Sequence, residues 1–363
     1  MSAPRPVPPD EQPVPPIAGP VHHVTTGDRA AHYRSTFHFL DHEGRSLLVT
    51  GLAVHPGRGV ADAYATLTRR TGTLAVRARD TFGEDRARQH VGPLRVDVLE
   101  PLRRLRLTCD DALLSYDLEW EAAFPAVEEP YHPRYRGGRL LPRAGRFVQA
   151  GTCHGVVRTG DGEEIRVERG RWTAARDRNR GAGPAPGEAP GRAEQGRRPG
   201  GFHWLWMAIR FDDRFVLVTA LEDAGGFRTP DEVLQITEYG PDRRLGPARV
   251  DVTYRKGTRE PVSAVAHLAA GRIEAEVMLS GPLAVAAGHP PARDPRHGRG
   301  KGRGWLERRT YDLTDPAVTA PAAYGVTDHA ARFAWDGRVG YGILEHGGFG
   351  RHTPRGFTRQ EAM

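Results

Sequence analysis

Apolar and polar residues that alternate with a period of two most constrain what this chain can fold into. Between Leu114 and Glu121, the residues Leu, Tyr, Leu and Trp occupy every second position and are separated by Ser, Asp and Glu. Residues 249–254 and 272–279 repeat the pattern. Because successive side chains of a strand point to opposite faces, each such strand has one dry and one wet face. This arrangement is typical of antiparallel sheets and barrels.

Strand-like segments recur along most of the chain at the short spacing of all-β domains. The 44 glycines and 30 prolines favour many turns over long helices. Thr229-Pro-Asp-Glu232 is the one segment that resembles a helix start, and strand-like sequence returns soon after it. We therefore predict an all-β protein with short helices only.

The length of 363 residues predicts two domains. Residues 1–29 form a proline-rich lead-in that we expect to be disordered or to lie against the body in extended form. A shift in composition near 224–231 places the boundary between domains of residues 30–225 and 226–355. Two insertions rich in Gly, Pro and Arg, at 180–201 and 288–304, are predicted as loops. They either overhang the mouth of a barrel or are simply exposed to solvent.

The net charge of +7 invites a nucleic-acid interpretation, but the distribution of charge argues against it. Lys256 and Lys301 are the only lysines, and all other residues of the Lys and Arg count are arginine. Codon bias in a GC-rich genome produces such a preference for arginine over lysine. Acidic residues are interspersed throughout the sequence. No run of 18 apolar residues predicts a membrane helix, and no secretory signal is visible, so we expect a cytoplasmic protein. Cys109 and Cys153 are expected to be buried and reduced.

Motifs for nucleotide, serine-hydrolase or metal chemistry are not found. The sequence has no Gly-X-Gly-X-X-Gly after a strand, no phosphate-binding loop, no Gly-X-Ser-X-Gly, no His-Glu-X-X-His and no Cys-X-X-Cys. His38 and His42 share a strand face but lie more than about 10 Å apart, too far to bind one ion. We predict no cofactor and no metal site.

The segment from Arg146 to Gly181 predicts strands joined by a tight turn at Gly160-Asp161-Gly162 and ends in an Arg-Asp-Arg-Asn-Arg cluster. Asp177 either belongs to an ion-pair cluster that closes one end of a barrel or lies at a ligand cavity. The arginines beside it would lower its pKa, which opposes a proton-donor role. Arg176 and Arg178 are better suited to anchor a ligand carboxylate or phosphate.

Aromatic residues mark the predicted strand at 202–211. Trp204 and Trp206 share one face of it, and the other face is also apolar, so both faces are expected to be buried. The tryptophans either pack in a core or form a wall that binds an apolar ligand or stabilises a carbocation. Trp120 and Trp172 are candidates for the same lining.

Glu345 ends the last predicted strand and is followed by His346. The glutamate is either an ordinary polar residue exposed at the end of a strand or one half of a carboxylate–imidazole pair at the cleft between the domains. Such a coupled pair could carry out acid–base chemistry.

These segments together resemble a known family. The Gly-rich turn between strands, the Arg176-Asp177-Arg178-Asn179-Arg180-Gly181 cluster, the aromatic strand from Phe202 and the closing residues 336–345 look like lipocalin-like proteins related to carotenoid 1,2-hydratase (hydroxyneurosporene synthase) and AttH. The resemblance covers residues 30–350 and implies two lipocalin-like antiparallel barrels packed together. This sequence departs from the family pattern Arg-Asp-X-Ser-Trp-Gly, because Asn179 and Arg180 stand where the family has Ser and Trp. Losing that aromatic face disfavours carotenoid-like hydration but leaves the fold unaffected.

We therefore expect the chain to bind an apolar small molecule of isoprenoid, polyketide or lipid-like character in a barrel or an inter-domain cavity. Hydration or cyclisation of that molecule is the associated chemistry. The predicted catalytic residues are Asp177 and Glu345, and the predicted ligand-binding residues are Trp120, Trp172, Arg176, Arg178, Trp204 and Trp206. The alternatives are a non-catalytic carrier or sensor, or an interaction protein with filled barrels. No nucleic acid and no integral membrane association are expected, and the oligomeric state stays open.

Overall fold

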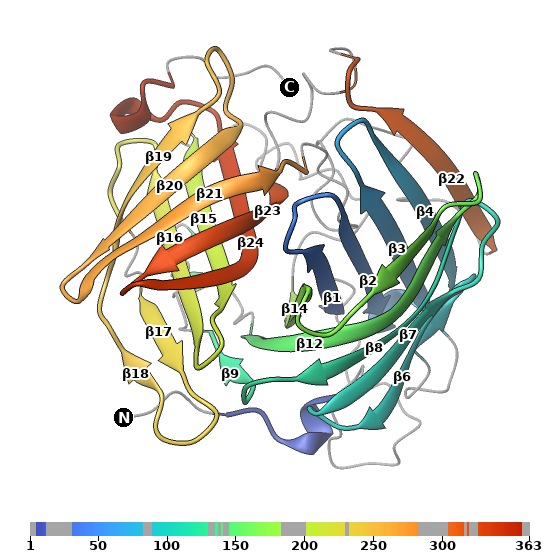
Figure 1. Cartoon of the computed structure of the whole chain (residues 1–363). Helices are drawn as coiled ribbons and strands as arrows, with labels where there is room; N and C mark the ends of the chain where they lie inside the picture. The colour runs from blue at the N-terminus through green and yellow to red at the C-terminus, as the bar shows by residue number, and fades with distance from the viewer. Residues whose placement is uncertain are drawn as a thin grey trace.

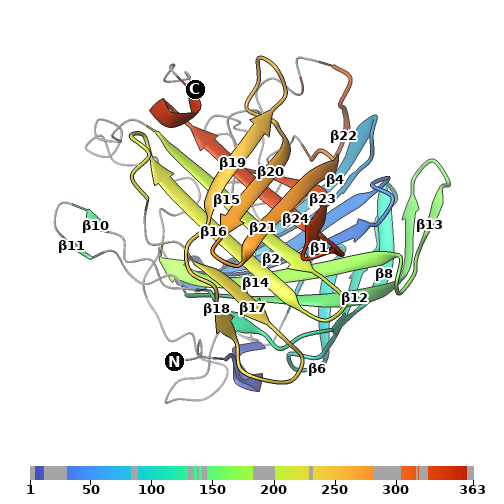
Figure 2. The same ribbon diagram turned by 60° about the vertical axis from the view of Figure 1, so that its left-hand side comes forward.

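The computed structural model describes residues 5–11, 31–82, 89–129, 135–136, 139–140, 145–182, 201–228, 232–281, 304–315, 318 and 326–357. Two curled antiparallel sheets lie side by side and cross each other where they meet (Figures 1 and 2). The first is blue to green in Figure 1 apart from one orange-red strand at its edge, and the second is yellow to red. The prediction of an all-β fold is confirmed.

The first sheet contains 13 strands among the described residues. Its order is β22 (Trp305–Asp312), β4 (Gly72–Thr81), β3 (Val60–Thr68), β2 (Leu47–His55), β1 (Ala31–Asp41), β14 (Trp172–Ala182), β12 (Gly145–Thr159), β8 (Leu114–Ala122), β7 (Arg104–Cys109), β6 (Leu94–Glu100) and β5 (His90–Val91), with β9 (Val127–Glu128) and β13 (Glu164–Val167) also paired to β12. The sheet curls until β5 and β6 contact β3.

The second sheet contains nine strands in the described part of the chain. Its order is β18 (Arg243–Arg244), β17 (Val233–Ile236), β16 (Phe215–Asp223), β15 (Phe202–Arg210), β24 (Arg338–Phe349), β23 (Val326–Trp335), β21 (Gly271–Leu279), β20 (Pro261–Leu268) and β19 (Arg249–Tyr254). A separate hairpin pairs β10 (Tyr135–Arg136) with β11 (Arg139–Leu140).

Helical structure in the described residues is limited to short pieces, among them the 3-10 turns η1 (Pro8–Glu11), η2 (Pro56–Arg58) and η4 (Thr353–Arg355). This agrees with the prediction of short helices only, although residues 229–231 of the expected helix start lie outside the described residues. No helix in the described residues has the length and hydropathy needed to cross a membrane.

Period-two alternation builds three apolar layers. In β8 the residues Leu114, Tyr116, Leu118 and Trp120 are buried in the interior of the first sheet, as the alternation predicts. A second layer fills the interior of the other sheet around β15, β16 and β21. The third layer lies between the two sheets, where outward-facing residues of β1, β2 and β12 pack on those of β15, β16 and β24. Burial at this junction joins the two sheets into one body.

The sheets divide the chain differently from the predicted domain boundary. Strands β15 and β16 precede residue 225 but belong to the second sheet, and β22 follows it but pairs with β4 of the first sheet. A composition shift cannot reveal this, because it marks a turn between strands and not the sheet that each strand joins. We propose that the main division falls between β14 and β15, with β22 returning to the first sheet.

The described part of the N-terminal lead-in lies against the body of the protein. Turn η1 lies beneath the first sheet (blue-violet in Figure 1), and the Glu11 side chain is buried. Residues 12–29 of the lead-in lie outside the described residues.

Gly342 lets β24 and β15 approach closely beside the site described below. A Cβ atom at this position would lie 1.9 Å from the carbonyl oxygen of Ala208. Gly342→Ala must therefore push two paired backbones apart, and we expect it to lower the free energy of unfolding by about 1–3 kcal/mol. Urea denaturation measures the effect. Gly225→Ala is the control, because its Cβ would meet only a side-chain oxygen at 3.4 Å; an equal loss in both variants would contradict the prediction.

Candidate functional site between the two sheets

Charged residues interrupt the apolar layer between the sheets at one place. Six side chains gather there from five strands and the segment after β9, and we name them the interface acid cluster: Glu129, Asp177, Asp328, Glu345, Arg146 and His38. Each comes from a strand position that faces the other sheet or from a segment beside one. The tryptophans Trp204 and Trp206 border the cluster.

The first-sheet side of the cluster is organised by Arg146 of β12. Its Nε lies 3.2 Å from Oδ1 of Asp177 on neighbouring β14, and its Nη1 lies 3.8 Å from Oε1 of Glu129. The guanidinium also stacks on the Trp206 ring at 4.4 Å. Trp206 in turn donates its indole N–H to Glu129 over 2.6 Å. One cation thus contacts two carboxylates and an aromatic ring from the opposite sheet.

The second-sheet side is centred on Glu345 of β24. Register places Trp206 of β15 and Asp328 of β23 directly opposite it, so the three side chains share one face. Trp204 donates its indole N–H to Oε1 of Glu345 over 2.5 Å. His38 Nε2, from β1 of the other sheet, lies 3.4 Å from Oδ2 of Asp328.

Acidic groups outnumber the basic groups within the cluster. Four carboxyl groups share the site with one guanidinium and one imidazole. Burial raises the pKa of Glu345 to about 7, an effect that Arg146 opposes and that Asp328 strengthens. Burial likewise raises the pKa of Glu129, although Arg146 opposes it. A carboxyl group with a pKa of about 7 is partly protonated at neutral pH, as a general acid needs to be.

His38 is the imidazole of this site. Burial opposes its charged form, but Asp328 and, further away, Asp177 and Glu345 outweigh that effect and raise its pKa. His38, whose pKa is raised, and Glu345, whose pKa is about 7, are two groups of the cluster that can exchange protons with a bound molecule.

Asp177 lies in this cluster, but its ionic partner differs from the expected one. The arginines next to it in sequence point to the opposite face of β14 because side chains alternate along a strand. Arg176 and Arg178 instead hold the carboxylate of Glu11 at the end of the first sheet's interior. Arg146 is the residue that pairs with Asp177.

The four predicted tryptophans fall into two groups. Trp204 and Trp206 belong to the layer between the sheets, whereas Trp120 and Trp172 are buried in the interior of the first sheet. The structure therefore does not bring Trp120 and Trp172 into one lining with the other two.

Neither alternative for Glu345 holds: its side chain is buried, and it forms no pair with His346 because neighbouring strand residues face opposite ways. His346 points into the second sheet's interior, where the Tyr254 hydroxyl lies 3.2 Å from its Nε2 and 3.1 Å from Nε2 of His203. Burial lowers the pKa of His346 to about 3, so this imidazole is neutral.

Sequence reasoning missed Arg146, Glu129, Asp328 and the role of His38. A usable signal existed for Arg146, which alternates in phase with Val148 and Ala150 on an apolar face of β12. A charged residue in phase with apolar ones indicates a buried ion pair. Asp328 has no such local signal, since its partner comes from the other sheet.

Open space near the site is limited. Buried apolar side chains pack together in the interiors of both sheets. A small pocket of about 20 Å³ lies between the cluster and turn η1, with Arg146, Arg178, Phe147 and Tyr33 in its wall. Among the described residues, no group of three or more His, Cys, Asp or Glu side chains is arranged to hold a metal ion.

The two curled sheets with a buried site between them define a protein of the lipocalin-like class with tandem barrels. The chain belongs to a family of unknown function, DUF8625, whose model matches residues 7–358. No curated protein matches it.

Solved structures with a similar fold include a protein described as an AttH, from Nitrosomonas europaea. It is 13% identical, the alignment covers 92% of this chain and 97% of that chain, and the TM-score is 0.56. Kievitone hydratase from Nectria haematococca is 12% identical, with 91% and 93% covered and a TM-score of 0.48. CghA is 10% identical, with 92% and 90% covered and a TM-score of 0.49. The expected resemblance to AttH is confirmed for the fold.

Proposed function

We propose that the chain binds an apolar small molecule of isoprenoid, polyketide or lipid-like character between its two sheets and catalyses its hydration or cyclisation. The observation that carries this proposal is the buried carboxyl group of Glu345, whose pKa of about 7 keeps it available as an acid. A proton donor works best when its pKa lies near the working pH. The cluster is buried, so a ligand reaches it by displacing apolar side chains of the surrounding layer.

Hydration at this site balances as follows. Glu345 donates its proton to one carbon of a carbon–carbon double bond, and the π electron pair forms the new C–H bond. The other carbon becomes a cation, to which water adds through its oxygen. One proton of that water returns to Glu345, so an alkene and water yield an alcohol. In cyclisation a second double bond of the same molecule replaces the water, and Glu345 recovers its proton from a C–H bond.

The remaining side chains stabilise the cation. Asp177 and Asp328 carry negative charge close to Glu345 and favour positive charge that develops there. Trp204 and Trp206 supply the aromatic wall. Asp177 acts in this scheme through its charge and not as a proton donor, because Arg146 holds it as an ion pair.

The proposed compartment is the cytoplasm. Cys109 and Cys153 are both buried and unpaired. Burial raises the pKa of the Cys109 thiol to about 12, so this cysteine remains an inert thiol under reducing conditions.

The test uses purified full-length chain, farnesol as an acyclic isoprenoid probe, water labelled with ¹⁸O, and mass spectrometry. Hydration adds one labelled water to the probe, and cyclisation yields an isomer of unchanged mass with a new retention time. We expect product with the wild type and a rate at least about 100-fold lower with Glu345→Gln, which cannot donate the proton. Asp117→Asn on the exposed face of β8 is the control and should retain the wild-type rate.

Equal rates for Glu345→Gln and the wild type would refute the assignment of the acid. Tight retention of the probe without a new product would remove the catalytic part of the proposal and support a carrier. If farnesol and longer polyenes neither bind nor react, the binding proposal itself fails.

A further inference from the structure

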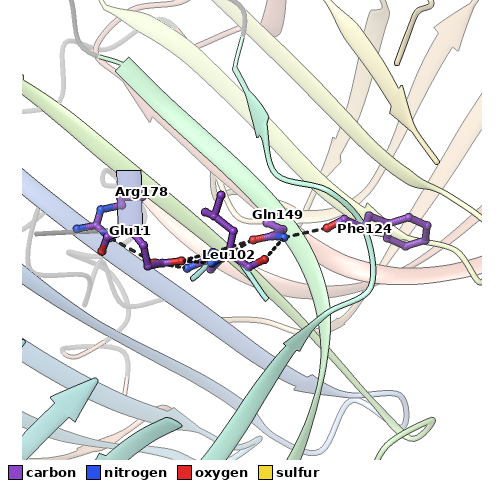
Figure 3. A network of polar contacts seen from close by, with 6 residues as sticks. Glu11, Leu102, Phe124, Gln149 and Arg178 are labelled. Carbon is purple, nitrogen blue, oxygen red and sulfur yellow. Dashed lines mark hydrogen bonds and ion pairs between the residues drawn. The ribbon is translucent and has the colours of Figure 1, made fainter. Parts of the chain in front are cut away.

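Glu11 inserts a carboxylate into the end of the first sheet's interior. This place lies on the opposite face of β14 from Asp177 and the interface acid cluster. Its side chain is 2% exposed. Arg176 holds both oxygens, with Nη1 2.7 Å from Oε1 and Nη2 2.9 Å from Oε2. The backbone N–H of Leu102 donates to Oε2 over 2.8 Å, and Arg178 Nη1 lies 3.3 Å from Oε1 (Figure 3).

The groups that receive this carboxylate are positioned without it. Gln149 Oε1 accepts hydrogen bonds from Nε and Nη2 of Arg176 at 3.1 and 2.8 Å. The Gln149 amide in turn donates to the carbonyl oxygens of Leu102 and Phe124, both at 2.9 Å (Figure 3). The ring of Trp120 lies 4.5 Å from the Arg176 guanidinium carbon. Gln149 and Trp120 therefore fix the orientation of the Arg176 guanidinium before any carboxylate binds, as a preorganised binding site requires.

The segment that supplies Glu11 is held mainly by this one side chain. Turn η1 has four residues. Its neighbouring contacts are the ion pairs of Asp10 with Arg180 at 3.1 Å and of Arg5 with Asp242 at 3.0 Å, and a hydrogen bond that Arg178 donates to the Glu11 carbonyl oxygen. The basic side chains of the two ion pairs are each 41% exposed, although Asp242 is buried, and a pair with one partner in solvent contributes less than the fully buried pair of Glu11 with Arg176. Glu11 is thus a tethered carboxylate in a receptor that the rest of the fold builds.

We propose that Arg176, Arg178, Gln149 and the Leu102 N–H form a binding site for a small monocarboxylate, which Glu11 occupies as an intramolecular competitor. Removing Glu11 leaves two buried guanidinium groups without an anion, so the site favours any carboxylate that can replace it. A pocket of about 20 Å³ lies next to Arg178, and its wall combines the rings of Phe147 and Tyr33 with the charged side chains of Asp10, Glu128, Arg146 and Arg180. It leaves room beside the carboxylate for the first atoms of a short chain along the two rings. This inference does not depend on the proposed chemistry at Glu345.

The experiment is rescue of Glu11→Ala by added acetate. Thermal unfolding of the full chain is followed while acetate replaces chloride at constant ionic strength. We expect the variant to melt below the wild type and to regain stability along a saturating acetate curve. The wild type should show no saturating response, because its own carboxylate is present at a high effective concentration. Octanoate should bind the variant at least about 10-fold more tightly than the wild type in calorimetry.

Three further proteins decide the outcome. Glu11→Ala with Arg176→Met should lose the acetate response, and Asp10→Ala should behave as the wild type does. Glu11→Gln keeps the shape of the side chain and serves if Glu11→Ala fails to fold; octanoate should bind it more tightly than the wild type. The proposal is overturned if acetate acts no better than chloride on the Glu11 variants, or if the double variant responds equally. Equal rescue by inorganic phosphate would refute selectivity for a carboxylate.

Discussion

Arg146→Met is expected to lower the free energy of unfolding by about 3–5 kcal/mol at pH 8. The guanidinium of Arg146 is the cation that contacts both Asp177 and Glu129. A buried carboxylate that loses its partner retains the full cost of desolvation, which explains a loss of this size. Urea denaturation followed by tryptophan fluorescence measures it.

The loss should shrink at pH 5. Without Arg146 the folded-state pKa values of the cluster rise further above their unfolded values, since Arg146 is the group that lowers those of Glu129 and Glu345. A carboxyl group whose pKa is higher in the folded than in the unfolded state stabilises the folded state fully at a pH below its unfolded-state pKa. That contribution is lost as the pH rises through the folded-state pKa.

The control for Arg146→Met is Arg106→Met. Arg106 forms an ion pair with Asp117 on the surface, where the two side chains are 52% and 48% exposed. Its loss should cost less than about 1 kcal/mol. If Arg146→Met costs no more than Arg106→Met, the interface acid cluster is not a buried charged site.

Glu345→Gln is expected to make the chain more stable than the wild type at pH 8 and to leave it nearly unchanged at pH 5. Burial raises the pKa of Glu345 from 4.5 to about 7. A group with a raised folded-state pKa contributes stability that is fully present below its unfolded pKa and is lost as the pH rises through the folded value. The wild type should therefore lose about 2–3 kcal/mol between pH 5 and pH 8 that the variant keeps.

The measurement is the free energy of unfolding in urea at half-unit steps from pH 5 to pH 8. Asp117→Asn is the control, because the hydrogen bond from Arg106 lowers the pKa of Asp117 and keeps its titration out of this range. Parallel profiles for the wild type and Glu345→Gln would show that Glu345 is ionised throughout, and the proton-donor role would then fail.

Local pattern was enough to predict much of the fold. The burial of Leu114 and Trp120 on one face of β8 follows from alternation alone, because the period of a strand is two whatever it packs against. The same rule places Trp204 and Trp206 together on one face of β15. It could also have separated Asp177 from Arg176 and Arg178, since adjacent strand residues face opposite ways.

Partners from distant segments could not be predicted in this way. Glu11 reaches Arg176 across 165 positions of sequence, and His38 meets Asp328 from the other sheet. Neither contact leaves a local pattern, because the first depends on where the N-terminal segment docks and the second on which outer faces of the two sheets pack together. The same holds for β22, which joins β4 although it follows most of the second sheet in sequence.

The sequence by itself determined the all-β class and the strand faces, because alternation and turn residues act over a few positions. The resemblance to the AttH fold was carried separately, by the motifs around residues 176–181, 202–206 and 336–345. Tertiary structure alone decided the chemistry of the site. It brought Glu345 and Asp328 against Arg146 and His38 in a place that excludes water, and that exclusion raises the pKa of a carboxyl group to about 7. Desolvation depends on what every neighbouring segment covers, and no single strand carries that information.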